Sequence, residues 1–179
     1  MSEKTKLTDR EVRIIYLPPM TMASIHCIGG APETDTAKIM DQFVKNCNLA
    51  GIKPDYRHFC FDHPQGKLSD GSDHGFERWV SIPDDMGINE PMKKKKFSGG
   101  LYASIMRPIV PMEFFREGWE LLSTWVMENK KYDFRAGDPE TKYGLMNEHL
   151  NCINLSIEPV DEQAMQLDLL MPIKEKKNV

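Results

Sequence analysis

The chain of 179 residues has no long apolar run and no apolar segment near its N-terminus. Its longest apolar stretches are far shorter than the roughly 20 residues that span a bilayer, and residues 1–10 form a polar, charged tail. The sequence therefore predicts a cytoplasmic protein with no membrane partner. Its 4 cysteines include no CxxC pair, which indicates reduced, mostly buried thiols rather than a disulfide framework.

The sequence motifs of metal, nucleotide and nucleophile chemistry are also missing. It contains no HExxH, GxSxG, GxGxxG or P-loop pattern. His58, Asp62, His63 and His74 lie near one another without a metal-ligand spacing, so we expect neither a metal nor a cofactor. A net charge of −4 argues against direct nucleic-acid binding, and the one dense basic run, Lys93–Lys96, is interpreted as a solvated strand entry.

What is present is an ordinary globular composition, with 40% apolar and 28% charged residues, and a recurring order of elements. Apolar periodicity and the positions of Pro and Gly predict strand, helix, strand, strand in each half. In the first half these are residues 12–28, with a break at Pro18-Pro19, then a helix from Pro32 to a cap at Gly51, and strands 56–61 and 76–82. In the second they are strand 96–107, a helix from Pro111, and strands 143–150 and 166–173.

This echo predicts an internal duplication in an α+β fold. We expect one domain over residues 11–174, with module one at about 11–83 and module two at about 95–174. Two such modules would leave a cleft between them, where ligand sites are common.

The strand over residues 76–82 carries the first candidate site residues. Because alternate side chains of a strand share a face, Glu77 and Trp79 point the same way, opposite to Phe76, Val80 and Ile82. A carboxylate beside an indole suits a flat or cationic organic ligand. The alternative is an exposed strand face with an isolated Trp.

Glu148 is the second acid of interest. On a strand it would share a face with Met146 and Leu150 and be partly buried, which is costly for a carboxylate unless it is paired, protonated or bound to a cation. Either it is the counter-charge or the base of a site, or it is a strand glutamate bridged to a Lys or Arg.

The helix of the second half has an unusually wide apolar stripe. Trp119 lies at the edge of the stripe, where it either packs in the core or lines a cavity. The 12 methionines would suit an adaptable apolar pocket as well as an irregular core. The stripe consists of Phe114, Phe115, Gly118, Trp119, Leu121, Leu122, Trp125 and Val126.

Several short segments together resemble the GyrI-like small-molecule-binding family, the effector-binding module that is also fused to AraC- and MerR-type regulators. They follow one another in the family's order across nearly the whole chain. The segments are Leu17-Pro18-Pro19-Met20 with Gly29-Gly30, Phe76 to Pro83, Phe97 to Ala103, Glu148-His149-Leu150-Asn151, and Asp168 to Ile173.

The resemblance implies two strand-helix-strand-strand modules related by a pseudo-twofold around a central aromatic cleft. It places the family's ligand-binding glutamate at Glu148, with Trp79 and Tyr102 as flat walls. Because about ten polar residues precede the first strand here, the chain looks like a stand-alone member without the DNA-binding domain of the regulators. The full set of ligand-binding residues that we predict is Glu148, Trp79, Tyr102, Glu77, Met106, Met146 and Trp119.

Three hypotheses follow for the function. The first is a module that binds planar, amphipathic or cationic small molecules, as a xenobiotic sequestrant or sensor, alone, as a homodimer or with a regulator partner. The second, suggested by some stand-alone relatives, is a hydrolase of strained electrophiles such as cyclopropane-bearing DNA-alkylating compounds, with Glu148 as catalytic base and no metal or cofactor. The third is an interaction protein with a filled cleft. The sequence leaves open whether the protein is an enzyme.

Overall fold

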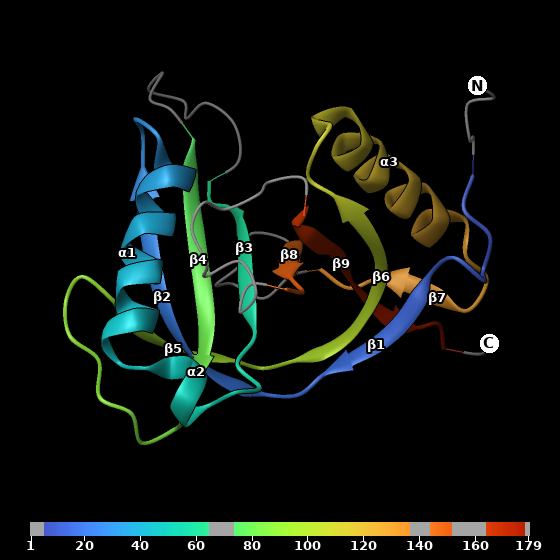
Figure 1. Cartoon of the computed structure of the whole chain (residues 1–179). Helices are drawn as coiled ribbons and strands as arrows, with labels where there is room; N and C mark the ends of the chain where they lie inside the picture. The colour runs from blue at the N-terminus through green and yellow to red at the C-terminus, as the bar shows by residue number, and fades with distance from the viewer. Residues whose placement is uncertain (1–5, 65–73, 137–143, 152–163, 178–179) are drawn as a thin grey trace. The chain divides into compact units, whose positions relative to one another are not determined.

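A computed structural model of the chain describes residues 6–64, 74–136, 144–151 and 164–177. In this part of the chain antiparallel strands combine with three helices, which confirms the predicted α+β class (Figure 1). No helix in the described ranges is long and apolar enough to cross a membrane. Cys152 and the predicted strand start at Tyr143 lie outside the described residues.

The chain divides into two compact units. Unit one combines Met1–Pro18 with Gly99–Val179, and unit two is Pro19–Ser98. The boundaries that we predict for the modules, about 11–83 and 95–174, stay a prediction. The units differ from those modules in two respects, because the strand that precedes Pro18 belongs to unit one and the strand at residues 93–97 belongs to unit two.

Unit two is an antiparallel sheet in the order β3-β4-β2-β5, with α1 packed on β2 and β4 (Figure 1). The helix α1 begins at Pro32, whose missing N–H costs nothing in a first turn, and Glu33 and Asp35 complement the helix dipole there. The elements of unit two are β2 Met20–Ile28, α1 Pro32–Asn46, α2 Leu49–Ile52, β3 His58–Asp62, β4 Gly75–Ile82 and β5 Lys93–Phe97.

The predicted cap of α1 at Gly51 is wrong. The helix ends at Asn46, Asn48 takes the left-handed conformation with φ of 49°, and Gly51 lies inside the short helix α2. Asn is the residue type that most readily replaces glycine in this conformation, so it ends the helix earlier than the glycine signal suggested.

Unit one is an antiparallel sheet in the order β1-β6-β9-β8, with β7 also paired to β9. The helix α3 packs on β6 and β9 (Figure 1). It buries most of its apolar stripe there, although Phe114 remains exposed. The strand β7 was not predicted. The elements are β1 Arg13–Leu17, β6 Gly100–Pro108, α3 Met112–Glu128, β7 Tyr132–Phe134, β8 Met146–His149 and β9 Gln166–Glu175.

The single strand that we predict over residues 96–107 is two strands. The break falls at Gly99 and Gly100, which have φ of 73° and 133°, conformations that favour glycine. The chain passes from unit two to unit one at this break, so β5 belongs to unit two and β6 to unit one.

The two units repeat one pairing pattern. The strands β1 and β5 begin at residues 13 and 93, and β2 and β6 begin at residues 20 and 100, so both pairs are 80 residues apart. Arg13 pairs with Ser104 just as Lys93 pairs with Ser24. Each half of the chain therefore gives its first strand to the second strand of the other half.

Candidate functional site

The strand β4 has two faces of different character. Arg78 donates a hydrogen bond to the Glu33 carbonyl of α1, so the face that Arg78 shares with Phe76 and Val80 is the one that α1 covers. Glu77 and Trp79 lie on the opposite face, which we call the acid face of unit two. Both side chains are 0% exposed, so this face is buried as well.

Four aromatic rings gather on the acid face of unit two. Phe59 and Phe61 of β3 pair in register with Trp79 and Glu77 of β4. The Phe61 ring meets the Trp79 indole edge-on, with 5.1 Å between centroids and an interplanar angle of 89°. Phe97 of β5 lies 6.1 Å from both Trp79 and Phe59. Such edge-to-face contacts are favourable beyond their buried area, and they hold the indole in one orientation.

The Glu77 carboxylate lies at the centre of a polar network. Trp79 Nε1 donates to Oε1 at 2.6 Å, Lys95 Nζ lies 2.7 Å from the same oxygen, and His63 Nδ1 lies 2.8 Å from Oε2. Burial raises the pKa of the Glu77 carboxyl, but the hydrogen bonds from Lys95, Trp79 and His63 outweigh burial and hold the pKa below its ordinary value. Glu77 is therefore a buried anion at neutral pH.

Lys95 also contacts the indole. It reaches across β2, which lies between β4 and β5, and its Nζ is 5.5 Å from the centroid of the Trp79 ring. This is cation–π range, so one ammonium group meets both the carboxylate and the aromatic face. The expectation that residues 93–96 are simply solvated is wrong at Lys95, since its side chain is only 19% exposed.

Unit one places four of the predicted residues on one face of its sheet. Glu148 pairs in register with Asp168, which pairs with Met106, while Met146 pairs with Leu170. Tyr102 lies four residues from Met106 on the same strand, so these side chains share a face that we call the acid face of unit one. Glu148 and Asp168 are 5% and 3% exposed, so two acids lie side by side in a buried setting.

Both acid faces carry cations of the chain itself. Arg13 of β1 pairs with the Asp168 carboxylate across β6 and donates to Ser104 Oγ at 3.2 Å. Asp168 and Glu77 thus occupy matching positions, each neutralised by a basic residue from the edge strand. The Arg135 guanidinium lies 5.6 Å from the centroid of the Tyr102 ring.

The structure does not bring Trp119 to the acid face of unit one. It packs with the apolar cluster that includes Ala103, Ile105 and Leu169. These residues alternate with Tyr102 and Asp168 along their strands, so their face is the one that α3 covers.

Sequence reasoning missed Lys95, Phe97, Arg13 and Asp168. The alternation of Lys93, Lys95 and Phe97 along one strand was the available signal, since a buried aromatic shares the face of two lysines. The targets of the basic side chains lie on strands that are distant in sequence, so the pattern gave no indication of them.

Two groups of side chains among the described residues could in principle hold a metal ion. In the first, His26, His63 and Glu77 bring their ligand atoms within 4.8 Å of one another. His26 Nε2 lies 2.5 Å from the His63 carbonyl oxygen, and Lys95 already contacts Glu77, so a metal would have to displace an ammonium group. The second group is Glu33, Asp62 and His74, in which a Glu33–His74 contact of 2.6 Å engages two of the three.

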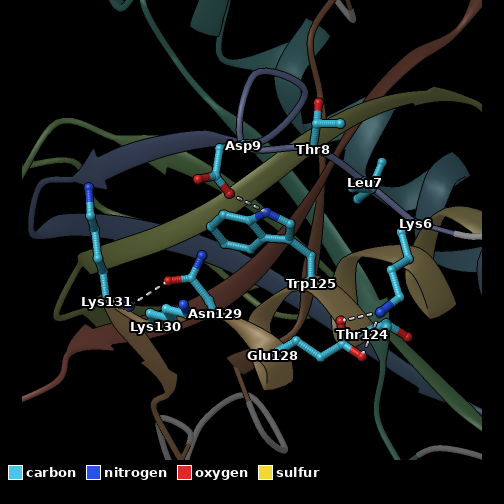
Figure 2. Close-up of a pocket in the computed structure, with 10 residues that line it drawn as sticks. All are labelled: Lys6, Leu7, Thr8, Asp9, Thr124, Trp125, Glu128, Asn129, Lys130 and Lys131. Carbon is cyan, nitrogen blue, oxygen red and sulfur yellow. Dashed lines mark hydrogen bonds and ion pairs between the residues drawn. The ribbon is translucent and has the colours of Figure 1, made fainter.

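A separate pocket of about 370 Å³ lies in unit one at the C-terminal end of α3 (Figure 2). The Trp125 indole donates to Asp9 at 3.0 Å, and Lys6 bridges Glu128 at 2.9 Å at the side of the pocket. None of the predicted ligand-binding residues lines it. Its lining is Lys6, Leu7, Thr8, Asp9, Thr124, Trp125, Glu128, Asn129, Lys130 and Lys131.

Comparison with known proteins shows the family to which the chain belongs. The sequence pattern of the Cass2 family, described as integron-associated effector binding protein, matches residues 13–173. This match confirms the predicted resemblance to GyrI-like effector-binding modules. No curated protein matches the chain in sequence.

Three solved structures share the fold. EcmrR in a complex with DNA is 13% identical with a TM-score of 0.62, and the match covers 92% of this chain and 57% of that one. The C-terminal domain of EcmrR is 11% identical with a TM-score of 0.62, covering 92% and 98% of the two chains. A hydrolase from Listeria innocua is 12% identical with a TM-score of 0.60, covering 92% of each. The chain thus spans little more than half of the EcmrR chain in the DNA complex.

Proposed function

Because the chain belongs to the Cass2 family of integron-associated effector-binding proteins, we propose that it binds planar, amphipathic or cationic small molecules. Effector binding is the property of the family, and the chemical class of the effector is our inference from the two acid faces. We assign the contacts to Glu148, Trp79, Tyr102, Glu77, Met106 and Met146.

One observation carries the proposal. In unit two a primary ammonium group lies 2.7 Å from a buried carboxylate and 5.5 Å from the centroid of an indole ring. A buried charge is stable only when it is paired, and an indole face attracts cations in the same setting. Trp79 and Glu77 therefore form an environment in which an organic cation is held by both charge and stacking.

The acid face of unit one supports the same class of ligand. Two carboxylates, Glu148 and Asp168, lie in register, and Arg13 pairs with Asp168. Two buried carboxylates on one face attract a cationic ligand more than a neutral or anionic one. Met106 is 49% exposed, and a flexible thioether can adapt to ligands of different shape.

A charge series on one ring system tests the proposal. The probes are 9-aminoacridine, acridine and acridine-9-carboxylate, which are cationic, neutral and anionic near neutral pH, titrated against the full chain by fluorescence and calorimetry. We expect the cation to bind most tightly, the neutral ring less tightly and the anion least. Equal affinities for the three, or no binding of any, would overturn the proposed ligand class.

Glu148→Gln locates the counter-charge. We expect it to weaken 9-aminoacridine by about tenfold to a hundredfold, the scale of a charged hydrogen bond, with little change in the free energy of unfolding. Glu120→Gln on the exposed side of α3 is the matched control and should change neither property. Loss of stability with unchanged affinity would make Glu148 a structural residue.

A second candidate function is hydrolysis of a strained electrophile, as implied by the resemblance. The observation that favours it is the pair of buried acids, because a positioned carboxylate can act as a general base toward water. Mass spectrometry after incubation with a cyclopropane-bearing alkylator distinguishes the two. A hydrated product that disappears with Glu148→Gln indicates an enzyme, whereas recovery of intact compound indicates a binder.

Four further features stay part of the proposal. They are a pseudo-twofold relation of two modules around a central cleft, a cytoplasmic location, the absence of direct nucleic-acid contact, and action as a homodimer or with a regulator partner. A structure of the protein with a bound acridine would test the first of them directly.

A further inference from the structure

We propose that Lys95 occupies the position of a cationic ligand beside Trp79, and that a planar cation binds there by displacing its ammonium group. This inference rests on the proposed function and adds to it the residue that sets access and selectivity. The ligand class is a planar organic cation that carries a single charge.

The first step concerns what covers the indole within unit two. Trp79 is fully buried, and the side chains that contact its ring on the acid face of that unit include Phe61, Phe97 and Lys95. Moving either Phe would expose a large apolar ring to water, which is unfavourable. Lys95 differs, because a lysine can extend its four-carbon chain and keep its ammonium group in water. Lys95 is therefore the neighbour that can leave at least cost.

The position of Lys95 in the sheet makes this movement available. It lies on β5, the edge strand of unit two, and its side chain is already partly exposed. Lys93, two residues earlier on the same face, is exposed. The backbone can thus stay in place while the side chain of Lys95 turns toward the exposed end of its strand.

The second step concerns charge. Glu77 supplies one negative charge, and its Oε1 already accepts from Trp79 and Lys95. A second cation at this carboxylate would lie within a few ångströms of the lysine ammonium and be repelled by it. Binding of a ligand cation and retention of Lys95 are therefore mutually exclusive, and recognition is an exchange of one cation for another.

Exchange explains how selectivity arises. A neutral planar molecule that displaced Lys95 would leave Glu77 buried without its ammonium partner, which is costly. A cationic one restores the lost pair and adds stacking on the indole. The exchange of Lys95 for the ligand thus disfavours the binding of neutral and anionic ring systems relative to cationic ones.

The test compares Lys95→Met with wild type, using 9-aminoacridine and acridine as probes. Methionine keeps the length and removes the charge. We expect 9-aminoacridine to bind Lys95→Met about tenfold or more tightly than wild type, since no charged hydrogen bond has to be broken, and acridine to gain at least as much, since it cannot restore the broken pair in wild type. Lys93→Met is the matched control, the same substitution on the same face without a Glu77 contact, and should bind like wild type.

Two additions keep the test decisive if Lys95→Met folds poorly. The double variant Glu77→Gln with Lys95→Met removes both charges of the pair, and it should not show the increase in affinity for 9-aminoacridine that Lys95→Met shows. In wild type, acetylation of Lys95 by an activated ester, measured by peptide mass spectrometry, should rise when 9-aminoacridine is bound. Labelling of Lys93 should not change.

The outcomes separate this inference from the proposed function. If wild type binds 9-aminoacridine but Lys95→Met binds it equally and Lys95 labelling is unchanged, the exchange is refuted and the proposed function stands. If wild type binds no acridine but Lys95→Met binds the cation, the position beside Trp79 accepts a cation, but its displacement of Lys95 is refuted together with the proposed function. If neither protein binds, both are refuted.

Discussion

The buried Glu77 carboxylate offers the sharpest prediction about the fold. Glu77→Gln keeps the shape of the side chain and removes its charge. Three donors meet that charge at 2.6, 2.7 and 2.8 Å, from Trp79, Lys95 and His63. Removing one partner of a buried ion pair costs about 3–5 kcal/mol, and since Lys95 is partly exposed we expect a value near the lower end, about 3 kcal/mol.

The loss of stability caused by Glu77→Gln should depend on pH in a defined direction. Burial raises the pKa of Glu77, but Lys95, Trp79 and His63 bring it below the value in the unfolded chain, about 4.3. A lowered pKa contributes stability that is fully present above the unfolded value and is lost as the pH falls through the folded one. The gap between wild type and Glu77→Gln should therefore be constant near neutral pH and shrink below about pH 4.

Urea unfolding followed by circular dichroism at pH 7 and at pH 3.5 measures both quantities. The control is Glu128→Gln, whose ion pair with Lys6 is exposed on both sides and should contribute less than about 1 kcal/mol. A gap for Glu77→Gln below about 1 kcal/mol at pH 7, or one that persists unchanged in acid, would show that the network around Glu77 has been misjudged.

Three other outcomes are expected. Arg13→Met should lower the melting temperature more than Asp168→Asn. The first substitution leaves a buried carboxylate without its partner, whereas the second leaves only a half-exposed guanidinium without one; the reverse order would contradict this. Gly118→Ala should destabilise by about 1–3 kcal/mol although alanine favours helix, since its Cβ would lie 2.9 Å from Leu169 Cδ1; a higher melting temperature would contradict it. Trp79→Ala should lower stability by about 3–5 kcal/mol. At temperatures where that variant is folded, it should weaken planar ligands more than small aliphatic ones, and equal weakening in titrations would refute the stacking role.

Local signals in the sequence predicted most of the elements. The break at Pro18-Pro19 separates β1 from β2, Pro32 begins α1, and the alternation around Trp79 sorted the side chains of β4 correctly between two faces. Each of these signals acts over a few residues, through a fixed backbone angle or the two-residue period of a strand. Such effects are visible in a sequence without knowledge of the fold.

The errors at Lys95 and Asp168 share one cause, which is pairing between strands that are distant in sequence. Lys95 has the same local pattern as the exposed lysines beside it, and only the pairing of β5 with β2 brings it near Glu77. Asp168 lies in an apolar strand and gains its partner, Arg13, from 155 residues away. The early end of α1 at Asn46 has a different, local cause, since the helix-ending signal of Gly51 competed with that of Asn48 three residues earlier.

By itself, the order of apolar, proline and glycine residues determined the α+β class and the repeated series of elements, because these follow from steric limits on short stretches of backbone. Glu77, Trp79 and Glu148 were also recognisable, the first two because strand alternation puts a carboxylate beside an indole and the third because a carboxylate among apolar neighbours is costly. Tertiary structure alone decided which cation each acid receives. Strand pairing joins residues by hydrogen bonds that are indifferent to sequence separation, so the partners of Glu77 and Asp168 became visible only when the sheets were formed.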